Sequence, residues 1–239
     1  MNDFYTFIIS SSINIGHLSD VNIIDKETRF NETLKTIESI KTKIPNVKIV
    51  LVDNSSQQLD NKLVEILSNK VNIFHQVEHN IFTLFSNNIG SKGIGEAYIM
   101  SVALSLIKQN NLIGKRIFKI TGRYLLADSF DIKIYDDFSF IGSYAFKINQ
   151  WDVSSDNFIN HRETVTYFET RLWSFCYQLF DEYIKLLDKI FAMMVSNIGR
   201  PLCNYERSHY YTIPHDKVVE IKTMHVEGIT ANTGVYKFE

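Results

Sequence analysis

The chain has 239 residues, of which 45% are hydrophobic and 22% charged, the composition of a globular protein rather than a disordered one. Its 25 basic and 27 acidic side chains nearly cancel, which argues against a dedicated nucleic-acid binder because such proteins carry a basic excess. The two cysteines, Cys176 and Cys203, lack the spacing of a zinc or disulfide motif, and we expect reduced thiols in a cytoplasmic protein. No apolar run reaches the roughly 18 residues of a membrane helix, so we expect no membrane span.

The first half of the chain alternates apolar strands with amphipathic helices. Apolar residues at three- and four-residue spacing predict helices that begin near Thr28 and Leu59, and Pro45 ends the first of them. A third helix follows the glycine-rich segment 87–96. The predicted strands are residues 4–10, 47–52, 71–74 and 116–120. This alternation is typical of a mostly parallel sheet covered by helices.

The last third of the chain mixes the two kinds of element. A long amphipathic helix over 177–195, which packs in the core or against a second copy in a homodimer, precedes a helix over 201–211. The strands expected there are 132–135, 138–146, 167–175, 218–221 and 224–229. No linker divides the chain, so we expect one α/β domain over 1–239 with a Rossmann-like, mostly parallel central sheet.

Several catalytic motifs are excluded. The sequence contains neither the phosphate loop GxxxxGK[ST] nor the nucleophile elbow GxSxG. His75 to His79 match H-x-x-E-H, which binds zinc only when both histidines share a helical turn. The preceding VNIF predicts a strand, in which four residues span about 13 Å, too far for one metal to bridge.

Polar side chains follow the second predicted strand. Asp53, Asn54 and Ser55 stand where the carboxyl end of this strand opens, and open α/β sheets bind ligands at that edge. A carboxylate and an amide there can hydrogen-bond a base or a ribose. The alternative is an Asx turn that only caps the strand, because Asp and Asn favour such turns.

Basic residues appear at two further places. Lys92 and Gly93 precede a helix N-terminus, which attracts anions, although a plain turn is the alternative. Lys119, Thr121 and Arg123 end the fourth strand, where a guanidinium is suited to bidentate phosphate contact. A structural salt bridge is the alternative for these two cations.

These pieces, in this order, resemble a nucleotide-sugar-dependent glycosyltransferase of the GT-A fold, of the bacterial or viral polysaccharide type. The resemblance spans nearly the whole chain and rests on FIIS, VKIVLVDNS, NIGSKGIGEAYIMSVAL, RIFKITGRYLLADSF, CNYERSHYYTIP and VEGITANTG. It implies that residues 1–130 bind a nucleotide-sugar donor, with Asp53 on the nucleotide, and that 131–239, with two acceptor-side helices, bind a glycan acceptor.

The chain departs from this family in lacking an Asp-x-Asp motif, whose carboxylates hold a divalent ion against the leaving diphosphate. Thr121, Gly122 and Arg123 stand at the expected place. We therefore assign no metal ligand and expect Lys119, Arg123 or Lys92 to supply the positive charge. Dependence on Mn or Mg stays open, with Asp128 as a displaced carboxylate.

An inverting transfer also needs a base for the acceptor hydroxyl, whereas a retaining one does not. Three carboxylates of the acceptor side qualify, namely Glu206, Glu169 and Asp152. We prefer Glu206, because the tyrosines of YERSHYY lower the local dielectric and raise its pKa. A solvated helix glutamate is the alternative, since Glu is rarely buried.

Two other functions fit part of the pattern. A sugar nucleotidyltransferase shares the sheet topology but carries a glycine-rich phosphate loop after the first strand, where this chain has SSSINIG. A non-catalytic nucleotide- or sugar-binding module keeps Asp53 and lacks the chemistry.

Overall fold

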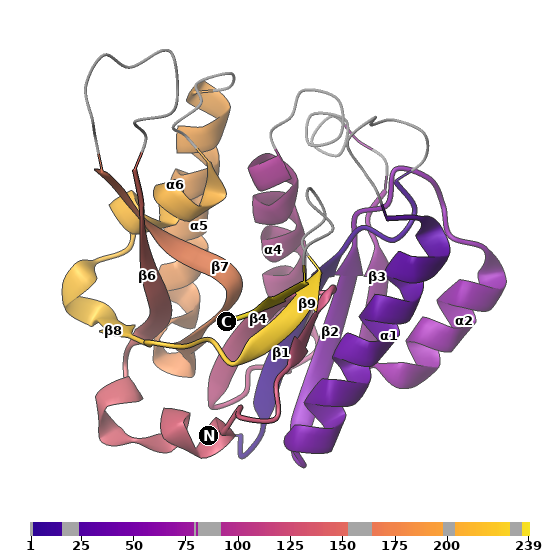
Figure 1. Ribbon diagram of the computed structural model, residues 1–239, viewed down its shortest axis with the longest axis horizontal. Coiled ribbons are helices and arrows are strands. Elements are labelled where there is room, and N and C mark those ends of the chain that lie inside the picture. The colour runs from indigo at the N-terminus through magenta and orange to yellow at the C-terminus, as the bar shows by residue number, and fades with distance from the viewer. Residues whose placement is uncertain are drawn as a thin grey trace.

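The computed structural model describes residues 2–15, 24–78, 80, 92–152, 164–197, 204–229 and 236–239 (Figure 1). Its centre is a seven-stranded sheet of order β3-β2-β1-β4-β7-β6-β8. β7 is antiparallel to both of its neighbours and the other pairs are parallel, which confirms the mostly parallel α/β fold expected from the sequence. The strands are β1 (Tyr5–Ser11), β2 (Val47–Asp53), β3 (Ile73–Gln76), β4 (Arg116–Thr121), β6 (Tyr144–Asp152), β7 (Thr164–Cys176) and β8 (Val218–Glu220).

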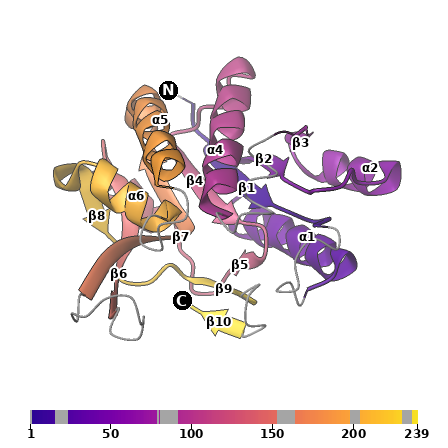
Figure 2. The same ribbon diagram turned by 90° about the horizontal axis from the view of Figure 1, so that it is seen from above.

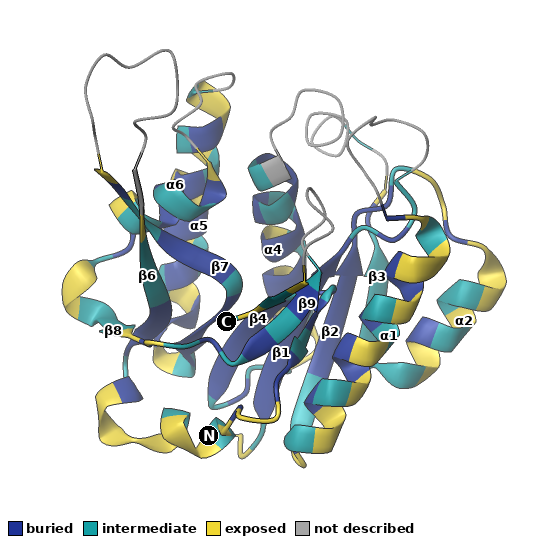
Figure 3. Ribbon diagram, viewed as in Figure 1, coloured by how far each residue is buried: buried dark blue, intermediate teal, exposed yellow. Residues whose placement is uncertain are grey.

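Helices cover both faces of this sheet (Figure 2). α1 (Lys26–Lys43) and α2 (Asn61–Lys70) lie on one face, and α4 (Lys92–Gln109), α5 (Phe180–Ser196) and α6 (Tyr205–Thr212) lie on the other. Alternate residues of β1 feed the two cores: Phe7 and Ile9 pack with α1, whereas Ile8 packs with α4. The central strands are therefore buried on both sides (Figure 3), as their continuous apolar runs predict.

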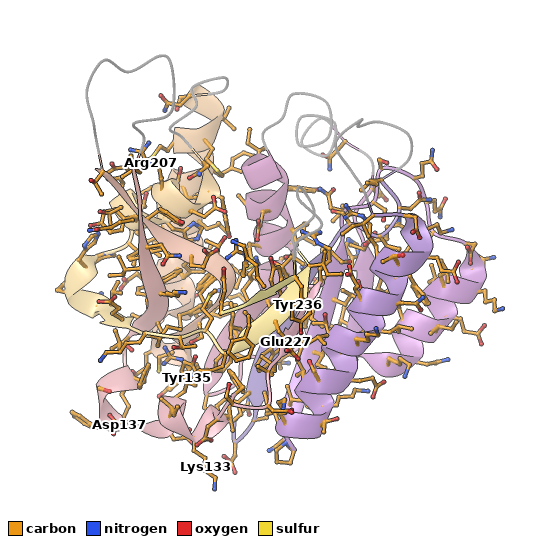
Figure 4. All side chains as sticks on the ribbon, viewed as in Figure 1. Lys133, Tyr135, Asp137, Arg207, Glu227 and Tyr236 are labelled. Atoms are coloured by element: carbon orange, nitrogen blue, oxygen red, sulfur yellow. The ribbon has the colours of Figure 1, made fainter. Side chains whose placement is uncertain are left out.

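A second, smaller sheet of order β10-β9-β5 lies beside the carboxyl end of β4 (Figure 1). Its strands are β5 (Tyr124–Leu126), β9 (Val226–Ile229) and β10 (Tyr236–Phe238). The Tyr236 hydroxyl donates to Glu227 Oε2 at 2.6 Å across β9 and β10 (Figure 4). Gly228 of β9 faces Tyr124, and a Cβ there would overlap the carbonyl oxygen of Arg123. Glycine at 228 therefore lets this sheet pack closely behind Arg123.

The structure corrects several predicted elements. Segments 132–135 and 138–140 are not strands but the 3-10 turns η1 (Ile132–Asp136) and η2 (Phe138–Phe140). The reason is local: the carboxylates of Asp131 and Asp137 accept from backbone N–H groups two residues on, which favours a tight turn over an extended chain.

The two C-terminal helices also differ in their bounds. The predicted helix 177–195 is the 3-10 turn η3 (Tyr177–Leu179) followed by α5. The predicted helix 201–211 is described from Tyr205, where the Asn204 side chain caps α6 by accepting from Arg207 N; residues 198–203 lie outside the described part. Within the residues that the structure describes, no helix is long and apolar enough to span a membrane.

Replacing Gly228 with Ala is expected to destabilise the fold by about 1–3 kcal/mol, because the added methyl group forces β9 away from Arg123. Urea unfolding measures the change. Lys237→Ala is the matched control, since Lys237 pairs with Gly228 across the sheet and its side chain forms only a long ion pair, 3.6 Å, with Glu239. Equal stability of Gly228→Ala and the wild type would contradict the close packing.

Candidate functional site

The carboxyl ends of β1, β2 and β4 meet at one edge of the large sheet, toward the upper side in Figure 1. Asp53, the last residue of β2, is fully buried there. Its Oδ2 accepts from Ser11 Oγ at 2.6 Å and from Ile13 N at 3.0 Å. Its Oδ1 accepts from Ser55 N at 3.0 Å, the geometry of an Asx turn. Asp53 thus holds the ends of β1 and β2 together, and its contact with a nucleotide stays a prediction.

Asn54 and Ser55 continue this edge and are buried. Asn54 N donates to the Ser11 carbonyl at 2.8 Å, and Ser55 Oγ accepts from Asn14 N at 2.7 Å. The polar run after β2 therefore shapes the segment that follows β1. The backbone N–H groups of Ile13 and Asn14 already donate to Asp53 and Ser55.

Asp53→Asn is expected to lower the free energy of unfolding by about 1–3 kcal/mol, because an amide nitrogen would face a buried donor in place of a carboxylate oxygen. Urea unfolding at pH 7 tests this. The control is Asp60→Asn, an exposed helix cap that accepts from Leu63 N. Asparagine caps equally well there, and the change loses only an exposed ion pair with Lys26. A loss no larger than that of the control would show that the Asp53 hydrogen bonds are dispensable.

Lys119 of β4 is 1% exposed and fully engaged within the protein. Its ammonium group donates to Glu96 Oε1 of α4, to Thr121 Oγ1 at 3.0 Å and to the Thr170 carbonyl of β7 at 2.8 Å. An ammonium has three protons, so none remains for a phosphate. Lys119 thus forms the structural salt bridge that the sequence leaves open as the alternative. Its geometry does not fit the expected role in neutralising a diphosphate.

Arg123, just beyond β4, has different surroundings. In the described part of the chain its guanidinium forms no ion pair, and its buried Nε has no hydrogen-bond partner. Burial lowers the pKa of this guanidinium, with Glu32 and Glu96 acting in the opposite direction. Of the two cations predicted at this strand end, Arg123 is thus the one that forms no ion pair among the described residues.

The other predicted residues of this half are placed less directly. Gly93 lies in the first turn of α4, where a Cβ would meet the Cβ and N of Tyr205 at 3.0 Å, so this glycine allows α4 to approach α6. Lys92 starts α4 and Asp152 ends β6, but their side chains lie outside the described residues.

An irregularity in β7 forms the opposite side of the edge. Lys147 pairs with Glu169 while Ala145 pairs with Ser174, so four residues of β7, 170–173, face Phe146 of β6. Such a bulge redirects side chains and is common beside active sites. It presents the Thr170 carbonyl to Lys119 and the Thr170 hydroxyl to Glu206 Oε1, at 3.4 Å.

Glu206, in the first turn of α6, is a carboxylate without a cation of its own. In the described residues it forms no ion pair. Burial raises the pKa of Glu206 to about 7, helped by Glu96 and Glu169 and opposed by Lys119. Burial also raises the pKa of Glu169. That side chain is tied down, however, by Arg171 Nη1 at 3.0 Å and Asn149 Nδ2 at 3.1 Å.

A buried histidine fixes the helix that carries Glu206. His209 Nδ1 is 2.8 Å from the Tyr205 carbonyl, and Nε2 is 2.9 Å from the Tyr183 hydroxyl of α5. Because a carbonyl only accepts, Nδ1 carries the proton and Tyr183 donates to Nε2. Burial lowers the pKa of His209 to about 3, so the ring is neutral at physiological pH and α6 is held against α5.

The raised pKa of Glu206 makes stability depend on pH. Between the ordinary glutamate value of 4.5 and about 7, the folded protein keeps a proton that the unfolded chain has released. Its stability therefore falls as pH rises through this interval, by up to about 1.4 kcal/mol per pH unit. Glu206→Gln, which cannot ionise, should become steadily more stable relative to the wild type from pH 4.5 to 7.

Urea unfolding of the wild type and of Glu206→Gln at half-unit pH steps measures the difference in their unfolding free energies. The titration of all other groups cancels in this difference. Glu38→Gln serves as the control, because the hydrogen bond from Lys70 lowers the pKa of Glu38, so this variant should not gain stability on the wild type over the interval. A constant difference between wild type and Glu206→Gln over the interval would mean that Glu206 titrates as an ordinary surface carboxylate.

Sequence reasoning missed Glu96, Thr170 and Arg171. A signal for the first was present: Glu96 is the only acidic residue of α4, and Lys119 stands in the apolar strand RIFKIT, so each needed a partner. No signal pointed to Thr170 and Arg171, because their position depends on the bulge in β7. His75 lies in β3, extended as expected, and no cluster of three or more potential metal ligands occurs among the described side chains.

Comparison with protein-family models and with curated proteins finds no match. Among solved structures, a nucleoside-diphosphate-sugar pyrophosphorylase from Vibrio cholerae has a TM-score of 0.52 at 9% identity, covering 95% of this chain and 95% of that chain. A glycosyltransferase involved in the glycosylation of the major capsid of PBCV-1 has a TM-score of 0.46 at 8% identity, covering 90% and 80%. The likeness to the pyrophosphorylase supports the α/β fold. At identities this low, structural similarity gives information about the fold and not about the function.

Proposed function

We propose that this protein is a glycosyltransferase that moves a sugar from a nucleotide-sugar donor to a glycan acceptor. One observation carries the proposal: a single sheet edge has an arginine without an ion pair on one side and, on the other, a carboxylate with a pKa near neutrality. Glu96 acts electrostatically on both of these groups, which supports assigning them to one site. Glycosyl transfer requires one group of each kind.

In this proposal, Arg123 binds the donor diphosphate and stabilises the negative charge that grows on it as the anomeric C–O bond breaks. Glu206 takes the proton of the acceptor hydroxyl while that oxygen forms the new bond to the anomeric carbon. A base with a pKa near 7 is suited to both accepting and releasing this proton at neutral pH. Glu169 is the weaker candidate because it is bound to Arg171, and Asp152 stays a candidate.

The residues at the place of the family's metal motif do not fit a divalent cation. The Thr121 hydroxyl already accepts from Lys119, and the guanidinium of Arg123 would repel a second positive charge. In the proposed reaction, the cationic side chain of Arg123 therefore takes the place of a metal. The nucleotide is proposed to lie across the ends of β1 and β2, over the segment that Asp53, Asn54 and Ser55 shape.

A sugar nucleotidyltransferase is the second candidate, favoured by the fold shared with the Vibrio cholerae pyrophosphorylase. This reaction requires free backbone N–H groups after the first strand to hold a triphosphate. In the described part of that segment, the N–H groups of Ile13 and Asn14 are bound to Asp53 and Ser55. This occupancy favours glycosyl transfer over the second candidate.

The test is a panel of nucleotide sugars incubated with and without glycan acceptors, in the presence of a strong chelator. We expect release of the nucleoside diphosphate, with Arg123→Met lowering kcat by about 10²–10³-fold and Glu206→Gln by about 10²–10⁴-fold. Lys133→Met, which removes an exposed cation on η1, is the matched control and should retain full activity.

Other results would point elsewhere. Pyrophosphate formed from a nucleoside triphosphate and a sugar phosphate would support the nucleotidyltransferase. Saturable binding without turnover would support a non-catalytic module. Activity lost in chelator and restored by manganese would contradict the role of Arg123, and an unchanged kcat in Glu206→Gln would remove that residue as the base.

A further inference from the structure

Glu206 lies close to a cation that it cannot use. The Lys119 ammonium acts on Glu206 electrostatically, and Thr170 contacts both, through its carbonyl and its hydroxyl respectively. A buried carboxylate so near a lysine normally forms a salt bridge and stays ionised. Here all three ammonium protons are directed elsewhere, and the one acidic acceptor among their partners is Glu96.

The cations near Glu206 are engaged by other carboxylates. Glu96 is paired with Lys119, and Arg171 bridges Glu169 and Glu239 with Nη1–Oε2 distances of 3.0 and 2.5 Å. Glu206 itself forms no ion pair among the described residues. Glu96 contributes to this, since it engages the ammonium that acts electrostatically on Glu206.

We infer that Glu96 is a positioning residue that keeps Glu206 able to exchange a proton, because it holds the ammonium of Lys119 away from the Glu206 carboxylate. The inference deepens the proposed function and rests on it for its catalytic meaning. A glutamate locked in a salt bridge is a weak base, since its proton affinity is low. An uncommitted glutamate in the same place accepts a proton near neutral pH.

The other groups near Glu206 do not have the effect that we assign to Glu96. β7 contributes Glu169, which Arg171 engages, and Tyr167. α5 packs against α6 through Tyr183, whose hydroxyl donates to His209. Tyr183 and the neighbouring Tyr205 stay neutral, because burial raises the pKa of each hydroxyl well above its ordinary value. Backbone N–H groups at the start of α6 favour the ionised carboxylate. Among the described side chains, Lys119 is thus the cation whose release would change Glu206 most.

The experiment measures the titration of Glu206 in the folded protein without any substrate. The difference in unfolding free energy between a protein and its Glu206→Gln partner is followed against pH, first in the wild type and then in the Glu96→Gln background. With Lys119 released, the pH interval over which this difference changes should move down by about 1–3 pH units. Lys119→Met, which removes the cation, should move it up.

Glu38→Gln, which breaks an exposed ion pair with Lys70 on the far face, is the matched control and should leave the interval unchanged. The double variant Glu96→Gln/Lys119→Met separates the release of Lys119 from the direct loss of the Glu96 charge, because that charge itself raises the pKa of Glu206. Its interval should move down less than that of Glu96→Gln. An unmoved interval in Glu96→Gln, or an equal downward shift in the double variant, would overturn the inference. If Glu96→Gln does not fold, an interval that Lys119→Met does not move up would overturn it.

These readings separate the inference from the proposed function. If no nucleotide sugar is turned over, the proposed function fails, while the position of the interval still decides whether Glu96 controls Glu206. If turnover is found, the acid limb of kcat against pH should move down in Glu96→Gln together with the interval. A merely structural Glu96 would lower stability and leave that limb in place.

Discussion

The ammonium group of Lys119 joins the parts of the molecule on which the candidate site depends. It lies in the middle of the large sheet and bonds to α4 through Glu96, to its own strand through Thr121 and to β7 through Thr170. Burying an ion pair costs more desolvation energy than burying apolar side chains of similar size. A charged pair at this point is therefore poorly explained by stability, whereas it fixes the relative positions of three elements that meet at one edge.

The bulge in β7 has the same effect at longer range. β7 pairs with β4 through 172–176 and with β6 through 164–169 and 174–175. The bulge between these two stretches directs Thr170 and Arg171 toward the carboxyl edge. Arg171 then reaches Glu239 beyond β10 and lies over the Tyr124 ring, with its guanidinium 5.6 Å from the ring centroid. The small sheet is thereby attached to the large one on the side of Arg123, where Gly228 permits the close approach.

Hydrophobic periodicity was enough to predict the first half of the fold. β1, β2 and β4 lie within a residue of their predicted bounds, since buried parallel strands are continuous apolar runs with polar ends. The segment 132–140 was mispredicted because alternating apolar residues resemble a strand, while the carboxylates that turn the chain act through local hydrogen bonds that periodicity does not register.

The candidate site was predictable only in part, for a related reason. The sequence pointed to Asp53, Arg123 and Glu206 as residues of suitable chemistry at suitable places. Whether each of them is bound by other side chains of the protein depends on partners distant in the chain. Lys119 and Glu96 are 23 residues apart, and Lys119 and Thr170 are 51 apart. Sequence pattern alone does not bring such residues together.

Two residues that violate the rules for a core are therefore the most informative ones in the chain. A lysine within RIFKIT and a glutamate within the apolar helix α4 each carry a desolvation cost alone. Together they form a neutral pair, and neither Glu206 nor Arg123 forms an ion pair among the described residues. Under the proposed function, the paired residues hold the framework and the other two groups bind the ligand. Such a site would handle an anion and a proton without any side chain having to break an existing ion pair first.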